Sequence, residues 1–218
     1  MGKLRQIYMR TYLSLIKKSQ LILLVISIGI LVVLPIFLVF YPEFLNFKIL
    51  YAAAHLSLFL VMIVRPLADL LPKLKFVRPL VILRKGMGVF SASIIVSFIL
   101  SKVITDPVGW VANFATTSYW SLENLALLAH LADISAILLL ITSNNLSKRL
   151  LGKNWKRIQR LSYVYFYGSA LYVFFIFEDD VALFYMVIVV ILTTLAYIKK
   201  RLPKQTKSGS SFTPNSIT

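Results

Sequence analysis

The chain has 218 residues, of which 59% are hydrophobic, and its formal net charge at pH 7 is +16. This apolar content is too high for a soluble domain and predicts an integral membrane protein. The chain has no cysteine, which excludes disulfides, iron–sulfur clusters and thiol redox chemistry.

The N-terminal segment, residues 1–18, carries apolar side chains at helical spacing, at Leu4, Ile7, Tyr8, Tyr12 and Leu15. Its basic side chains fall largely on the other face. This pattern predicts an amphipathic helix lying in the inner membrane interface. No small-residue cleavage site follows it, so we expect the first apolar run to be a retained anchor.

Six apolar runs then follow, each close to the length that crosses roughly 30 Å of hydrocarbon. They cover about 21–40, 49–64, 86–104, 122–141, 161–177 and 181–198. The predicted fold is therefore an all-α integral membrane protein, with a six-helix transmembrane bundle over residues 19–200. The remaining tail, residues 201–218, is rich in Lys, Ser and Thr and is predicted to be disordered.

The charges are sorted between the two sides of this bundle. All Lys and Arg residues except Lys48 and Lys102 lie in the N-terminal segment, the 65–85 and 148–160 loops and the stretch after Tyr197. Most acids lie at the opposite ends, at Glu43, Asp106, Glu123, Glu178, Asp179 and Asp180. Positive loops stay inside, so both termini are predicted to be cytoplasmic in a multi-pass inner (plasma) membrane protein. The basic excess then reflects topology and lipid attraction rather than nucleic-acid binding.

An aromatic cluster marks the predicted outer loop at 105–121, which contains Trp110, Phe114, Tyr119 and Trp120. One interpretation is an aromatic belt that anchors the loop in the outer interface. The alternative is a docking surface for a partner outside the membrane.

The most specific stretch runs from residue 141 to 175 and reads ITSNNLSKRLLGKNWKRIQRLSYVYFYGSALYVFF. It resembles the ferric-reductase-like transmembrane domain. Within that family it is most similar to the haem-binding membrane subunit of the periplasmic methionine sulfoxide reductase system. The matching elements are Thr-Ser at 142–143 and Leu-Gly-Lys-x-Trp at 151–155. Upstream, Arg-Pro-Leu-Ala at 65–68 and Arg-Lys-Gly-Met-Gly at 84–88 resemble the family's second-helix end and third-helix start.

The resemblance covers roughly residues 49–200 and implies six helices with both termini inside. The family ligates two haems with one histidine in its third helix and two in its fifth. The matching positions here hold Phe98, Gln159 and Tyr172. Neither helix contains a histidine in any register, so we expect the family's two-haem path to be absent in its usual form. Large side chains at these positions are expected to fill the haem space.

The chain has only two histidines, His55 and His130, so bis-histidine ligation allows one haem b at most. Both are predicted at similar depth in the outer half of the bilayer, where they could clasp one haem. Alternatively, they are structural: Asp133, three residues after His130, would accept its hydrogen bond, and His55 would bond a backbone carbonyl or a tyrosine. A third interpretation is a proton or ion role for the His130–Asp133 pair.

Three functions follow from these observations. The first is transmembrane electron transfer, as a subunit of an oxidoreductase, from a cytoplasmic-side donor to an outer-side acceptor protein. No flavin or nicotinamide domain is present in the sequence, so a separate protein would supply the electrons. The second is a haem-free membrane scaffold or partner-binding protein that has lost this activity. The third is a proton-linked membrane protein. No catalytic residue or carboxylate metal site is predicted, because the acids do not converge.

Overall fold

The computed structural model describes residues 2–44, 46–121 and 125–202. These residues form helices joined by short turns and contain no strand, which confirms the all-α class. The elements in chain order are α1 (Gly2–Phe40), η1 (Pro42–Phe44), α2 (Phe47–Leu70), α3 (Val77–Leu80), α4 (Leu83–Thr105), α5 (Pro107–Asn113), η2 (Thr117–Trp120), α6 (Ala126–Thr142), α7 (Asn145–Leu151), η3 (Gly152–Asn154), α8 (Trp155–Ile158), α9 (Leu161–Phe177) and α10 (Asp180–Arg201).

Each of the six predicted apolar runs coincides with one long helix. Within the described residues, four segments are long and apolar enough to cross a membrane: Gln6–Phe40, Phe47–Leu70, Val77–Thr105 and Asp180–Arg201. A fifth is reached if α6 is counted together with Asn145–Ile158, to which it is joined at a 98° bend. Helix α9 is apolar but has only 17 residues. These apolar helices make the chain a multi-pass membrane protein with four to five candidate spans, and the sixth span stays a prediction.

Helix α1 joins the predicted interfacial segment 1–18 and the first apolar run into one helix of 39 residues. No break separates the two, because the residues between them favour helix and Pro35 is the only proline inside. At about 1.5 Å per residue such a helix is far longer than the hydrocarbon core, so its N-terminal part extends beyond it. Most of the predicted disordered tail, 203–218, and the predicted outer residue Glu123 lie outside the described residues.

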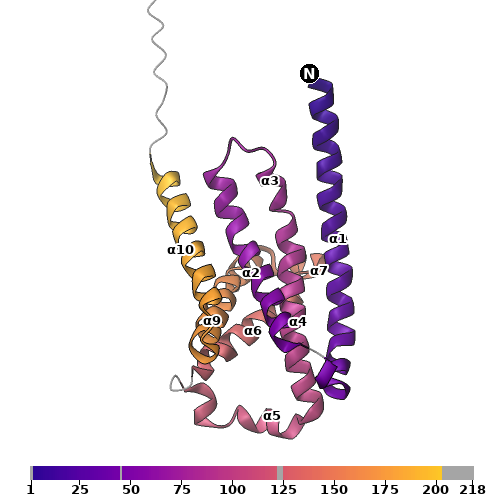
Figure 1. Ribbon diagram of the computed structural model, residues 1–218, viewed down its shortest axis with the longest axis vertical. Coiled ribbons are helices and arrows are strands. Elements are labelled where there is room, and N and C mark those ends of the chain that lie inside the picture. The colour runs from indigo at the N-terminus through magenta and orange to yellow at the C-terminus, as the bar shows by residue number, and fades with distance from the viewer. Residues whose placement is uncertain (1, 45, 122–124, 203–218) are drawn as a thin grey trace, which may run out of the picture.

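The long helices run between two ends of the molecule (Figure 1). We call one the basic end: it holds the start of α1, the α2–α3 connection and the end of α10. The acidic end holds η1, α5 and the α9–α10 turn. At the basic end, α10 is tied to α2, since Lys199 Nζ donates to the Leu70 carbonyl and Lys200 lies 3.7 Å from Asp69. Which end faces the cytoplasm stays a prediction.

Helix α4 lies at the centre of the bundle and packs against α1, α2 and α6. Its buried face is built from small residues, which lets neighbouring backbones approach closely: Gly86, Ser91, Ala92, Ser93 and Ser97. A Cβ added to Gly86 would lie 3.1 Å from the Leu23 Cβ on α1. Ser97 satisfies its hydroxyl by donating to the Ser93 carbonyl on its own helix.

Helices α6 and α9 pack as a short antiparallel pair. Each has 17 residues and so spans about 25 Å, whereas the 24 residues of α2 span about 36 Å. The chain between them folds across the bundle as α7, η3 and α8. Gly152 allows the reversal, because its φ is +48°. Trp155 fixes α8 by donating from Nε1 to the Thr142 carbonyl at 3.0 Å. The length mismatch leaves a space beside α2 and α4 at the basic end.

Candidate functional site

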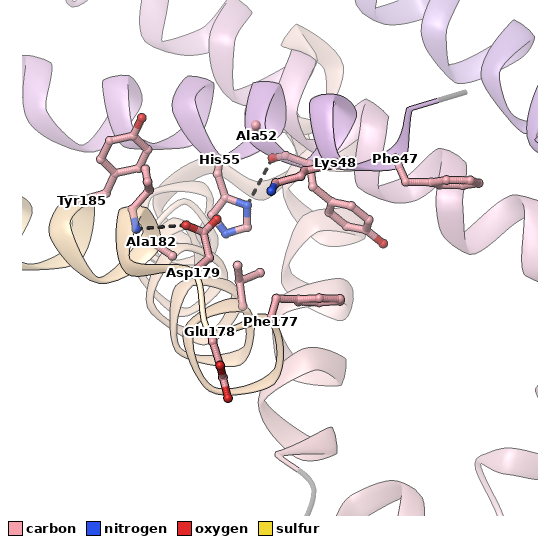
Figure 2. Close-up of a pocket in the computed structure, with 12 residues that line it drawn as sticks. Phe47, Lys48, Ala52, His55, Phe177, Glu178, Asp179, Ala182 and Tyr185 are labelled. Carbon is pink, nitrogen blue, oxygen red and sulfur yellow. Dashed lines mark hydrogen bonds between the residues drawn. The ribbon is translucent and has the colours of Figure 1, made fainter. Parts of the chain in front are cut away.

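A groove of 630 Å³ opens at the acidic end between α2 and the α9–α10 turn. Figure 2 shows Phe47, Phe177 and Tyr185 on its walls, with Lys48, Glu178 and Asp179 among them. The Asp179 carboxylate also caps α10, because it accepts from the Val181 N–H at 3.0 Å. We call this space the His55 groove, because His55 lines it.

His55 projects from α2 toward the α9–α10 turn (Figure 2). Its Nδ1 lies 3.3 Å from the Tyr51 carbonyl, one turn earlier on the helix. A backbone carbonyl is one of the two partners predicted for His55 if its role is structural. Its Nε2 is buried and has no hydrogen-bond partner among the described residues.

His130 belongs to a different environment, the aromatic cap formed by Trp110, Phe114, Tyr119 and Trp120. Its ring stacks on Tyr119 with centroids 3.4 Å apart, and Trp120 meets it edge-on at 6.1 Å. The Phe114 ring packs edge-on against the Trp110 ring, with centroids 4.6 Å apart. Burial, followed by the Asp133 charge, raises the pKa of the Tyr119 phenol, so the stacking partner is neutral at physiological pH. The cap holds η2 against α6.

The structure therefore does not bring His55 and His130 to one cavity. The His55 groove is lined from α2, α9 and α10, with no residue of α6. Within the described residues, no hydrogen bond joins His130 to Asp133, in contrast to the expected pairing, because the His130 ring turns toward Tyr119 instead. The bis-histidine haem and the proton role of His130 and Asp133 stay predictions.

The positions that match the family's haem ligands are filled by side chains. Phe98 on α4 stacks on Tyr51 of α2, with centroids 4.6 Å apart and planes 1° from parallel. Deeper in the bundle, Tyr165 of α9 is 2% exposed and shares a hydrogen bond of 2.9 Å with Ser91 of α4. Gln159 points to α6, where its Nε2 donates to Thr142 Oγ1 at 3.5 Å. The Phe98 side chain is therefore packed against α2, and the absence of a haem stays a prediction.

A second cavity, of 720 Å³, lies near the basic end between α2, α4, α6, α9 and the α7–α8 segment. We call it the cationic cavity, because its wall carries basic side chains and no acidic one: Arg65, Arg84, Lys85, Lys148, Lys156 and Arg160. This cavity was not predicted from the sequence. The signal was present, since the 65–85 and 148–160 loops had been assigned to one side of the membrane. Much of the family-like stretch converges here, including Ser143, Trp155, Gln159 and Tyr163.

Comparison with protein-family models, curated proteins and solved structures finds no match to this chain. The resemblance to the ferric-reductase-like domain rests on the motifs quoted above. The features that bear on function are the two cavities, the aromatic cap and the side-chain contact between α4 and α9.

Proposed function

We propose that this chain is a haem-free membrane scaffold, built as a six-span, ferric-reductase-like bundle in the inner membrane with both termini cytoplasmic. It acts by binding partners rather than by carrying electrons. The observation that carries this proposal is the stack of Tyr51 on Phe98, at 4.6 Å and 1°. It places an aromatic ring from α2 against the position where the resembled family would present a haem ligand.

The packing around this stack supports the same conclusion. Phe47 adds a third ring, 5.9 Å from Phe98. The hydrogen bond between Tyr165 and Ser91 links α9 to α4 through their side chains. Phe166, next to Tyr165, is fully buried. A haem bound at the Phe98 position would have to displace the Tyr51 ring that stacks on it.

The binding surfaces in this proposal lie at the acidic end. The His55 groove has a size typical of ligand clefts, about 300–1,000 Å³, with aromatic walls and a few polar groups. The neighbouring aromatic cap leaves Trp120 40% exposed and Val108 of α5 78% exposed. A surface that combines exposed aromatic side chains with a preformed groove favours recognition of a partner at the outer face.

Electron transfer through one haem is the second candidate, favoured by the unpartnered Nε2 of His55. A buried nitrogen without a partner is costly, and an iron ligand is one way to satisfy it. In this candidate a separate protein would reduce the haem from the cytoplasmic side, and an acceptor would take the electron outside.

A reduced-minus-oxidised visible spectrum separates the two candidates. We expect the purified protein, expressed with ample haem, to show no α-band of a b-type haem after dithionite reduction. A sharp α-band that disappears in both His55→Ala and His130→Ala would overturn the scaffold proposal and establish electron transfer. Asp133→Asn is the matched control, because it alters a polar side chain near His130 without removing a haem ligand.

A further inference from the structure

The cationic cavity has an unbalanced charge that no described residue of the chain neutralises. Asp69, at the end of α2, is paired with Lys200 of α10 and does not line the cavity. The other acids among the described residues lie at the acidic end or, as Asp133, within α6. Like charges gathered around one space repel one another, and an anion bound among them relieves that repulsion. The cavity is therefore built for an anion from outside the chain.

The basic groups are suited to phosphate in particular. Arg84, at the start of α4, is half-buried and lies close enough to Arg65 of α2 for their charges to repel. The planar guanidinium fork matches two phosphate oxygens at once, which an ammonium group cannot do. Lys148 and Lys156 approach from the other wall, and Lys148 lies 5.5 Å from the centre of the Trp155 ring. The cavity thus surrounds its occupant with cations from several helices.

Helix α7 adds an apolar element beside these cations. Leu146 and Leu150 are 64% and 77% exposed, and they share one face because they are four residues apart. The α7–α8 segment is bent by 98° from α6, so it lies across the bundle instead of along it. A helix with this orientation, apolar on one face and basic on the other, is typical of the membrane interface. Acyl chains would contact the leucines while a headgroup enters the cavity.

We propose that the cationic cavity binds the phosphate headgroup of an anionic phospholipid from the leaflet at the basic end. Basic pockets between membrane helices on the cytoplasmic side are a recurrent site for such headgroups. The apolar face of α7 distinguishes a lipid from free phosphate, because a soluble anion would gain nothing from it. This site is independent of whether the protein binds haem.

The test uses the full chain, delipidated in a neutral detergent, and titration calorimetry with dioctanoyl phosphatidylglycerol. We expect saturable binding of this lipid and none of dioctanoyl phosphatidylcholine, which has no net charge. Lys148→Gln/Lys156→Gln should weaken binding about 25-fold, since each cation near an anionic headgroup contributes about five-fold. The matched control is Arg149→Gln/Arg157→Gln, which removes the same charge from α7 and α8 but not from the cavity wall. It should weaken binding by no more than about three-fold.

Each alternative outcome is informative. Equal losses in the two double variants would show non-specific attraction to a basic surface and overturn the site. Inorganic phosphate that binds as tightly as the lipid would overturn the lipid assignment and leave a soluble-anion site. Absence of phosphatidylglycerol binding would also overturn the proposal. Gel-filtration profiles and melting midpoints without lipid must match the wild-type protein, so that a loss of binding is not a loss of fold.

Discussion

Replacing Gly168 of α9 with leucine is expected to destabilise the bundle by about 3 kcal/mol, because the side chain has no space to enter. Even a Cβ at this position would lie 3.1 Å from the Leu128 carbonyl and 3.5 Å from the Ala132 Cβ, both on α6. A backbone carbonyl cannot rotate away, so the two helices must separate. Reversible unfolding in mixed micelles, followed by circular dichroism, measures the change in free energy.

The matched control is Gly29→Leu in α1, where an added Cβ meets nothing within 4 Å. Leucine is a better helix former than glycine, so this variant should be unchanged or more stable by up to about 1 kcal/mol. Equal destabilisation by the two leucines would show that α6 and α9 are not in close contact. The pairing of these helices would then be wrong, and with it the origin of the cationic cavity.

The helices were predictable from the sequence because each apolar run must satisfy its backbone hydrogen bonds internally in lipid. Hydropathy therefore predicts where each of the six apolar helices lies along the chain. It did not give their lengths: α1 runs on through the predicted interfacial segment, and α6 ends where Ser143 and Asn144 begin the bend. Asn144 stops α6 by capping α7, since its side-chain oxygen accepts from the Ser147 N–H at 2.6 Å. Such local capping competes with helix continuation and is invisible to hydropathy.

The candidate site was less predictable, because it depends on which helices are neighbours. His55 and His130 were placed at similar depth by counting along their helices, but depth does not determine direction. The His130 ring is oriented by its stack on Tyr119. Tyr119 is close enough to stack because the loop before α6 folds back over that helix. That Phe98 and Tyr172 fill haem space stays a prediction from their size. The Tyr51 ring that stacks on Phe98 was not predicted, since it comes from α2.

The cationic cavity illustrates the same limit. The positive-inside pattern assigned the 65–85 and 148–160 loops to one side of the membrane but gave no reason for them to meet. They meet because α6 and α9 are shorter than α2, so the α7–α8 segment lies across the flank of the longer helices. Arg84 and Lys148 then line one space instead of two separate surfaces. The charged loops, which the sequence identified only by their side of the membrane, thus form a candidate binding site because the helices differ in length.

Truncation of Tyr165 to alanine is expected to cost about 3–5 kcal/mol, the largest loss we expect from a single side chain in this protein. The ring is 2% exposed, and its hydroxyl joins α9 to Ser91 of α4. Alanine leaves a cavity and an unpaired serine. Tyr165→Phe keeps the packing and removes only the interhelical hydrogen bond, so it should cost about 0.6–1.7 kcal/mol. Unfolding titrations of both variants measure these two contributions separately.

Tyr163→Ala is the control, because this tyrosine is two residues away on α9 and is 44% exposed; its truncation should cost less than about 1 kcal/mol. The comparison bears directly on the proposed function. The Tyr165 ring borders the cationic cavity yet is 2% exposed, so most of its surface is in contact with other side chains. Removal of a closely packed side chain costs the free energy of the contacts it made and of the cavity that it leaves. A Tyr165→Ala variant as stable as Tyr163→Ala would therefore contradict the close packing of the Tyr165 ring and weaken the proposal of a haem-free scaffold.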